Sequence, residues 1–322
     1  MRRLAERHPV LTYIALCYAI TWGVWFSIPL VAGGKWTLIK ILIGVGLGPG
    51  LAAVILDRVR GTAGPVRWLH FTAVFLAVAA LNVWSLLTGD AATAADLPAR
   101  QAIGLTPIGV AGALLAAAVC GYVFGAAAGS RTETLSSITR WRVPLRWWLV
   151  AALLIPVLLA VSVPITQLLG EEIDFTRGPW WWIVRSILFT LLVVGIGEET
   201  GWRGWMLPEL QKRFSPLTSS ILLGLTWGFW HLPLWIIGAY PGEPDAVVEY
   251  LFICPLLAIL FTWLFNRTGG NLLLAIVLHA AVNNGPRVIP STGPFALLLM
   301  ALIVTVVITE RMWRRRAALP SP

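Results

Sequence analysis

Charged side chains are scarce in this sequence. Asp, Glu, Lys and Arg make up 12% of the 322 residues, whereas hydrophobic residues make up 58%, and the mean hydropathy is +0.80. Charged residues form about a quarter of an ordinary soluble domain, so this composition excludes that class. The sequence instead has a series of apolar stretches of about 20 residues, the length of a helix that crosses a bilayer.

Cysteine is rare as well, at positions Cys17, Cys120 and Cys254 only. All three lie within apolar stretches and none has the spacing of a metal ligand, so we interpret them as packing residues. Basic residues exceed acidic ones and give a net charge of +9. Because they lie mainly between apolar stretches, orientation in a membrane explains the excess better than nucleic-acid binding does. The expected partners are therefore membrane lipid and membrane-associated molecules, and not nucleic acid.

Ten apolar stretches, separated by short polar connections, predict the fold class. We expect an all-α, polytopic transmembrane helical bundle with about ten spans, within a range of eight to ten, and no separate soluble domain. The predicted spans lie near residues 10–33, 37–56, 68–88, 105–128, 147–169, 180–210, 217–239, 248–265, 270–286 and 294–311.

The charges between the predicted spans predict the orientation. Every second connection is rich in arginine and lysine; these residues are Arg58, Arg60, Arg67, Arg131, Arg140, Arg142, Arg146, Lys212, Arg213 and Arg267. The other connections are acidic or nearly neutral, with the weak exceptions Lys35, Lys40, Arg100, Arg177 and Arg287. Basic connections stay in the cytoplasm, so the pattern predicts that both termini are cytoplasmic and that residues 312–322 form a basic cytoplasmic tail.

Three predicted spans carry polar residues far from their ends. These are Glu198, Glu199 and Arg203 in the sixth span, His231 in the seventh, and His279 and Asn283 in the ninth. At 1.5 Å per helical residue, most of them lie roughly 20 Å from the arginine-rich connections, and His279 lies about 14 Å in. Ionisable groups are costly at such depth unless they pair or function, so we expect the three spans to bring these side chains together.

Helix geometry suggests a role for each side chain. Glu199 and Arg203 are four residues apart, so they share a helix face and are expected to form an ion pair. Glu198 projects about 100° away from that line, which suits it as a general base beside a structural Glu199. His279 and Asn283 are also four apart, and both side chains can donate hydrogen bonds to an oxyanion.

Helix-disrupting residues accompany these side chains. Pro233 cannot continue a helical hydrogen-bond ladder, so we expect the backbone to loosen around His231, which is tolerable at membrane depth only beside a cavity. Gly195, Gly197 and Gly201 lack side chains and are expected to let another helix approach the sixth span closely. The four glycines between residues 44 and 50 likewise favour close helix packing over a nucleotide-binding loop.

The order of these motifs resembles a known family. Two glutamates with an arginine four residues after the second, an aromatic residue four positions before a histidine, and a histidine with an asparagine four positions later are similar to the motifs of the CPBP intramembrane glutamic endopeptidases. That family includes the type II CAAX prenyl proteases and bacterial relatives linked to bacteriocin immunity. The usual phenylalanine of the second motif is Trp227 here. The resemblance covers roughly residues 147–290.

The resemblance implies a multi-pass endopeptidase, in a bacterial plasma membrane, that acts on a membrane-anchored or lipidated peptide, as in CAAX processing. It implies that Glu198 and His231 activate water while His279 and Asn283 stabilise the oxyanion, with Glu199 and Arg203 completing the first motif. Residues 147–311 would then form the catalytic helices. Residues 1–146 would form N-terminal spans of unassigned role.

Other functions are compatible with parts of this pattern. Two glutamates and two histidines could ligate zinc, but the sequence has no His-Glu-x-x-His motif and Arg203 disfavours a second cation, so we expect neither metal nor cofactor. A covalent mechanism is not expected, because Cys254 has no histidine nearby in sequence and Ser186 lies about three turns before Glu198. Buried carboxylates and histidines also form proton relays in transporters, and a non-catalytic membrane scaffold or immunity protein is a third possibility.

Overall fold

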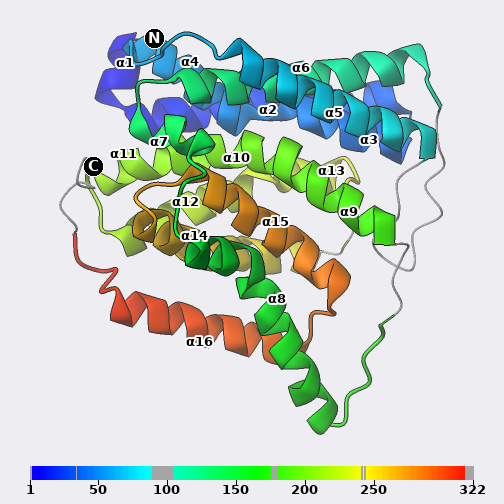
Figure 1. Ribbon diagram of the computed structural model, residues 1–322, viewed down its shortest axis with the longest axis vertical. Coiled ribbons are helices and arrows are strands. Elements are labelled where there is room, and N and C mark those ends of the chain that lie inside the picture. The colour runs from blue at the N-terminus through cyan, green and yellow to red at the C-terminus, as the bar shows by residue number, and fades with distance from the viewer. Residues whose placement is uncertain are drawn as a thin grey trace.

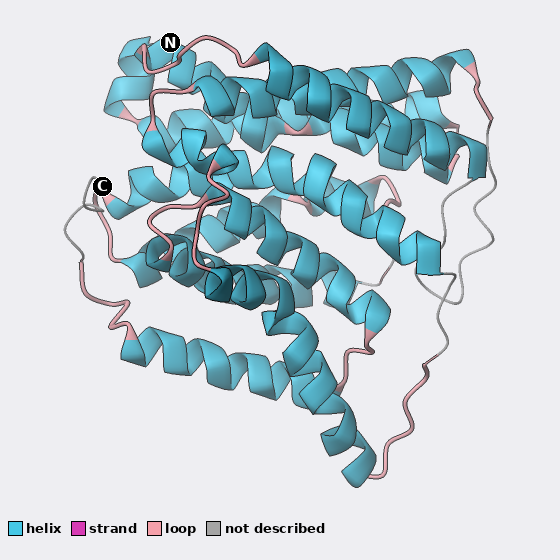
Figure 2. Ribbon diagram, in the orientation of Figure 1, coloured by secondary structure: helices cyan, strands magenta, loops and turns pink. Residues whose placement is uncertain are grey.

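The computed structural model describes residues 2–33, 35–88, 104–175, 180–240, 242 and 244–315. Throughout these residues the regular secondary structure is helical, with no strand (Figure 2). Most of the helices run side by side from one end of the molecule to the other in stacked layers (Figure 1). The prediction of an all-α helical bundle is therefore confirmed.

Each predicted span corresponds to a helix or to a broken run of helices. In chain order these are α2 (Pro9–Ala32); α3 (Trp36–Ile43), η1 (Gly44–Gly46) and α4 (Gly48–Arg60); α5 (Trp68–Thr88); α6 (Pro107–Gly129); α8 (Leu145–Leu168); α9 (Trp180–Phe189), η3 (Thr190–Gly195), α10 (Ile196–Gly201), η4 (Trp202–Met206) and α11 (Leu207–Gln211); α12 (Pro216–Trp230) and α13 (Leu232–Ile236); α14 (Pro244–Arg267); α15 (Leu272–Val288); and α16 (Gly293–Thr309). The short elements α1 (Arg2–Arg7), α7 (Glu133–Ser136) and η2 (Ser137–Thr139) lie between or before them.

Seven of these helical segments are long and apolar enough to cross a membrane, judged by length and composition. They are 9–32, 37–60, 68–88, 107–129, 145–168, 180–211 and 245–267. Two further apolar helices, α15 and α16, have 17 residues each. Large apolar side chains such as Leu30 (88% exposed) and Leu297 (74% exposed) lie on the outside of the bundle, where lipid would cover them. The chain is an integral membrane protein.

The arginine-rich connections meet at one end of the bundle. The amide of Arg131 donates to Thr62 O at 3.0 Å, and Arg140 Nη1 donates to Gly269 O at 2.9 Å. Arg315 likewise donates to the carbonyl of Arg213, and both α1 and the carboxyl-terminal end of α16 lie at this same side in Figure 1. The predicted grouping of alternate connections is thus confirmed. Of the charged residues named above, Arg100 and Arg177 fall outside the described residues, as does the tail from 316 onward.

Glycines bring α4 and α10 into close contact, as their spacing predicted. A Cβ atom on Gly201 would lie 2.4 Å from the carbonyl of Pro49, and one on Gly197 would lie 2.5 Å from the Leu47 side chain. On the facing helix, a Cβ atom on Gly50 would lie 2.7 Å from Gly197 O. Real Cβ atoms do not approach other atoms so closely, so the two helices pack at this distance only because these positions lack side chains.

Helix α2 holds the carboxyl-terminal part of α12. Tyr18 Oη donates to Thr226 O at 2.6 Å, and Trp22 Nε1 donates to Trp230 O at 3.0 Å. Trp230 Nε1 in turn donates to Thr21 Oγ1 at 2.8 Å. Because α12 ends at Trp230, the indole of Trp22 satisfies a carbonyl that the broken helix leaves unpaired.

Candidate active site

The two adjacent glutamates lie on α10, a short α-helix between the π-helical turns η3 and η4. Such turns insert an extra residue into a helix and are frequent at functional sites. Gly195 ends the first turn and Gly204 lies within the second, where a residue without a side chain tolerates the altered backbone. Glu198 is 4% exposed and Glu199 is fully buried.

Glu199 is the centre of a buried ion-pair layer, formed by Glu199, Arg203 and His279. Glu199 Oε1 accepts from Arg203 Nη1 at 2.8 Å and lies 2.7 Å from His279 Nδ1. The guanidinium of Arg203 also lies over the rings of Phe261, at 4.0 Å, and Trp227, at 4.9 Å. The predicted pairing of Glu199 with Arg203 is confirmed, whereas the contact with His279 was not predicted. A carboxylate accepts hydrogen bonds, so the Nδ1 atom of His279 is the donor.

Glu198 points away from this layer and bonds a different helix. Its Oε2 atom accepts from Trp227 Nε1 at 2.6 Å. Trp227 occupies the aromatic position four residues before His231, where a phenylalanine would have no donor. The indole therefore orients the Glu198 carboxylate while its second oxygen is left for other partners.

His231 lies where the seventh span breaks. Its amide donates to Gly228 O at 3.1 Å, α13 starts at Leu232, and Pro233 follows within the first turn of α13, as the sequence predicted. The ring Nδ1 atom is 2.8 Å from Trp227 O. A carbonyl only accepts, so Nδ1 carries the hydrogen and the neutral ring keeps its lone pair on Nε2. The rings of Trp230, at 4.6 Å, and Tyr250, at 5.0 Å, pack edge-on against the imidazole.

A cavity of about 410 Å³ joins the three polar spans. Four of the predicted site residues line it, namely Glu198, His231, His279 and Asn283. Glu199 and Arg203 do not line the cavity and lie behind it in the ion-pair layer. Glu198 is therefore separated from the pair of Glu199 and Arg203, as the helix geometry of the sixth span predicted. The cavity is otherwise mainly apolar and aromatic, with Trp25, Phe189, Ile253, Leu257 and Val282 among its lining residues.

Asn283 and Asn284 are neighbours with different surroundings. Asn283 is exposed towards the cavity, and its carbonyl accepts from Arg287 Nε at 3.1 Å. Asn284 is buried and donates from Nδ2 to Thr190 Oγ1 at 3.1 Å and to Ala280 O at 2.9 Å. Asn284 therefore ties α15 to the π-helical turn η3. Sequence reasoning did not identify it, because a buried structural asparagine has no spacing motif of its own.

Sequence reasoning also missed several cavity residues. Tyr240 and Tyr250 line the cavity beside His231, and Lys40 reaches it from α3. Ser186 and Cys254, which sequence distance had placed away from the site, both line the cavity. Cys254 reaches it because α14 packs closely on Gly224 of α12, where a Cβ atom would lie 2.9 Å from Cys254 O. Among the described residues, no hydrogen bond joins Cys254 to a histidine.

The nitrogen and oxygen donors of the site bear on whether it could hold a metal ion. Across the described part of the chain, no group of three or more His, Cys, Asp and Glu side chains has an arrangement that could hold a metal ion. Nδ1 is engaged on both His231 and His279, so Nε2 is the ring nitrogen left for other partners. The positive charge of Arg203 is bonded to Glu199, the carboxylate that would be the second acidic ligand, and this charge disfavours a cation at that position.

Comparison with known proteins gives matches in this part of the chain. Residues 179–285 match the family described as Type II CAAX prenyl endopeptidase Rce1-like. The CAAX prenyl protease 2 of Methanococcus maripaludis is 35% identical to the chain over 104 residues, which are 30% of this chain and 38% of that relative. The chain thus matches little more than a third of the relative's length. Residues 179–285, the part of the chain that is similar to this family, hold all six of the polar side chains described above.

Proposed function

We propose that this protein is an intramembrane endopeptidase that hydrolyses a peptide bond of a membrane-anchored or lipidated substrate. One observation carries the proposal: a single cavity joins Glu198, His231, His279 and Asn283, which come from three different helices of a membrane-spanning bundle. Buried ionisable groups that share a cavity at membrane depth mark functional sites. The name of the relative, CAAX prenyl protease 2, supports the same reaction class.

In the proposed reaction, water attacks the scissile carbonyl carbon. The Glu198 carboxylate accepts one water proton, and the lone pair of His231 Nε2 holds the same water by a hydrogen bond. The new C–O bond gives a tetrahedral intermediate with a negative oxygen. When the C–N bond breaks, Glu198 returns its proton to the leaving amine. The products are a carboxylic acid and an amine, and no covalent bond to the protein forms.

The oxyanion would be stabilised from α15. The Asn283 amide donates from Nδ2, and His279 donates from Nε2 when both of its ring nitrogens carry hydrogen. The Glu199 carboxylate accepts from His279 Nδ1 and so fixes the orientation of the ring.

We propose that the reaction needs no metal or cofactor. The ion-pair layer supplies the positive charge that a metal would otherwise bring to the oxyanion. Incubation with a strong chelator followed by gel filtration should therefore leave peptide cleavage unchanged. A loss that added zinc restores would contradict this part of the proposal. We also propose the bacterial plasma membrane as the location.

The proposed function is tested by replacing Glu198 with Gln in purified protein and following peptide cleavage by mass spectrometry. Glutamine keeps the size of the side chain and still accepts from Trp227, but it cannot take a proton from water. We expect cleavage to fall by about 10²- to 10⁴-fold while the melting temperature stays close to that of the parent. Glu171→Gln, at an exposed glutamate outside the cavity, is the matched control. Full cleavage by the Glu198→Gln protein would refute the assignment.

A further inference from the structure

The cavity has an inner and an outer end. At the inner end Glu198, Trp227 and His279 are buried, each less than 5% exposed. At the outer end Ser186 is half-buried and Asn283 is exposed. Exposure thus rises in one direction along the cavity, and that direction identifies the end from which a peptide reaches Glu198.

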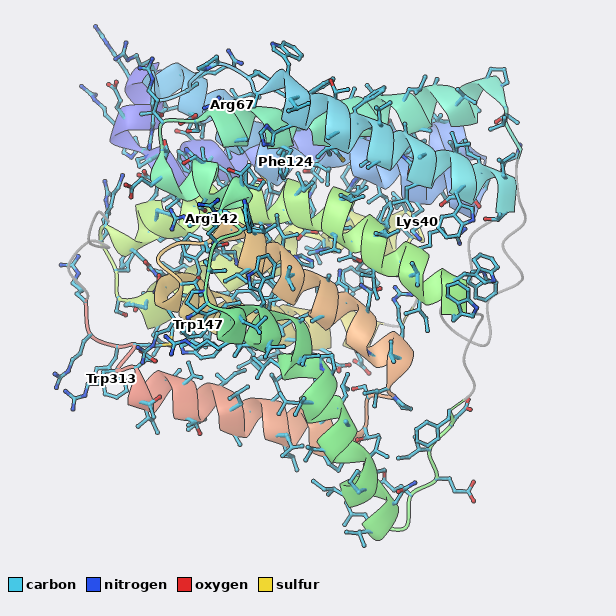
Figure 3. The ribbon with its side chains drawn as sticks, viewed as in Figure 1. Lys40, Arg67, Phe124, Arg142, Trp147 and Trp313 are labelled. Carbon is cyan, nitrogen blue, oxygen red and sulfur yellow. The ribbon has the colours of Figure 1, made fainter. Side chains whose placement is uncertain are left out.

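The outer end lies among helix ends far from the arginine-rich connections. Lys40 lies four residues after the start of α3, Ser186 six residues after the start of α9, and Arg287 one residue before the end of α15. Each of these helix ends adjoins one of the acidic or nearly neutral connections, which alternate along the chain with the arginine-rich ones. In Figure 3 Lys40 lies towards the right of the bundle, whereas Arg142 and Arg67 lie towards the left, the side of α1 in Figure 1.

Packed side chains lie between the inner end of the cavity and the arginine-rich connections. Beyond α10, the residues Trp202, Trp205, Met206 and Leu207 are at most 5% exposed. A Cβ atom on Gly204 would lie within 3.0 Å of side chains from both α7 and α15, so the layer is tight there. This packed layer, which is distinct from the ion-pair layer, extends from Arg203 to Lys212 and is about nine residues, or roughly 14 Å, thick.

The positive-inside rule assigns the arginine-rich end to the cytoplasm. We infer that the cavity is entered from the opposite, extracytoplasmic side of the membrane. Given the proposed function, the substrate class is a membrane-anchored peptide or protein whose scissile bond lies at or beyond the outer half of the bilayer. A lipidated C terminus lying in the cytoplasm would meet the packed layer around Trp202 and Trp205 instead.

Thiol labelling tests the direction of entry without requiring activity. Bacterial cells that express the full chain carry a single new cysteine as Glu172→Cys, Ser186→Cys or Glu133→Cys. Glu172 lies in an exposed connection at the outer end, Ser186 lines the cavity, and Glu133 is exposed on α7 at the arginine-rich end. The native cysteines are buried, and the unsubstituted protein measures their background labelling.

A small, membrane-impermeant maleimide is added to intact spheroplasts and to permeabilised ones. We expect Glu172→Cys and Ser186→Cys to react in intact spheroplasts, and Glu133→Cys to react only after permeabilisation. Reaction of Glu133→Cys in intact spheroplasts, with the other two protected, would overturn the inference. The inference would also be overturned if Glu172→Cys reacted in both preparations and Ser186→Cys reacted in neither. The reagent would then not reach the cavity from that side.

A cleavage assay links the entry route to the proposed reaction. A bulky maleimide adduct on Ser186→Cys should lower cleavage by at least about tenfold, whereas the same adduct on Glu133→Cys should leave it unchanged. One outcome is that detergent-solubilised protein cleaves peptide in a Glu198-dependent way while neither adduct lowers the cleavage rate. In that case the entry route is wrong and the proposed function stands. If the labelling pattern holds and no Glu198-dependent cleavage is found, the cavity opens outward and the proposed function fails.

Discussion

The N-terminal and C-terminal parts of the bundle contribute different groups to the candidate site: the first gives packing contacts and the second gives the polar side chains. Helices α10 to α15 supply all six polar side chains of the candidate site. Helices α2 and α4 supply backbone contact at Gly197 and Gly201 and hydrogen bonds to the end of α12. Among the described residues of the N-terminal part, Trp25, Lys40 and Ile43 line the cavity.

The residues proposed to take part in the reaction thus lie in one part of the chain, and the helices that position them lie in the other. The family match covers residues 179–285, the region with the polar side chains, and leaves α2 to α6 unmatched. Those helices nevertheless set how closely α10 approaches its neighbours and how the break at His231 is held. We therefore expect substitutions in the C-terminal part of the cavity to remove activity from a folded protein. Substitutions at the contact with α4 should first lower stability.

The largest loss of activity among the remaining tests is expected from His231→Gln. Glutamine can still donate to Trp227 O, but it lacks a basic nitrogen at the Nε2 position. We expect kcat to fall by about 10²- to 10⁴-fold with little change in melting temperature. His70→Gln, at a histidine that stacks on Phe124 away from the cavity, is the control. An unfolded His231→Gln protein would mean that the histidine supports the fold instead.

Breaking the ion-pair layer should lower stability most. Arg203→Met leaves the Glu199 carboxylate buried without its guanidinium, which we expect to cost about 3–5 kcal/mol of unfolding free energy. Arg2→Met removes the matching partner of Glu6 in an exposed pair of the same spacing, and its effect should be small. Thermal unfolding in detergent measures both. Equal melting temperatures for the two variants would show that the buried pair is not needed for the fold.

A smaller effect is expected at the tryptophan of the second motif. Trp227→Phe keeps an aromatic ring over Arg203 but deletes the donor to Glu198 Oε2. Hydrogen bonds to charged groups contribute about 1.5–3 kcal/mol, so kcat/KM should fall by roughly 10- to 100-fold. The pH profile of cleavage should shift as well, which a packing defect alone would not cause. An unchanged profile and rate would show that the indole does not orient the glutamate.

The smallest expected effect is on stability at the contact between α4 and α10. Gly201→Ala places a Cβ atom 2.3 Å from Tyr13 Oη and 2.4 Å from the Pro49 carbonyl, so the helices must move apart. Overpacking of this kind costs about 1–3 kcal/mol. Gly23→Ala is the matched control, because nothing lies within 4 Å of its added Cβ atom. If both variants melt alike, the close approach of α4 does not support the site.

Local geometry explains what could be predicted from the sequence. Span length, the alternation of charge and the spacing of four residues all follow from the rise and pitch of a single helix. They predicted the ten helical segments, the Glu199–Arg203 pair and the break at His231. The catalytic roles of the six polar residues, and the division of the chain after residue 146, remain predictions.

Other features depend on how each helix is rotated and how closely it approaches its neighbours, which a single helix does not encode. The contact between His279 and Glu199, the bond from Trp227 to Glu198 and the arrival of Cys254 at the cavity all cross between helices. The sequence by itself determined which side chains lie deep in the membrane. Only the tertiary structure decided which of them meet, and at which end their cavity opens, because packing between helices sets both.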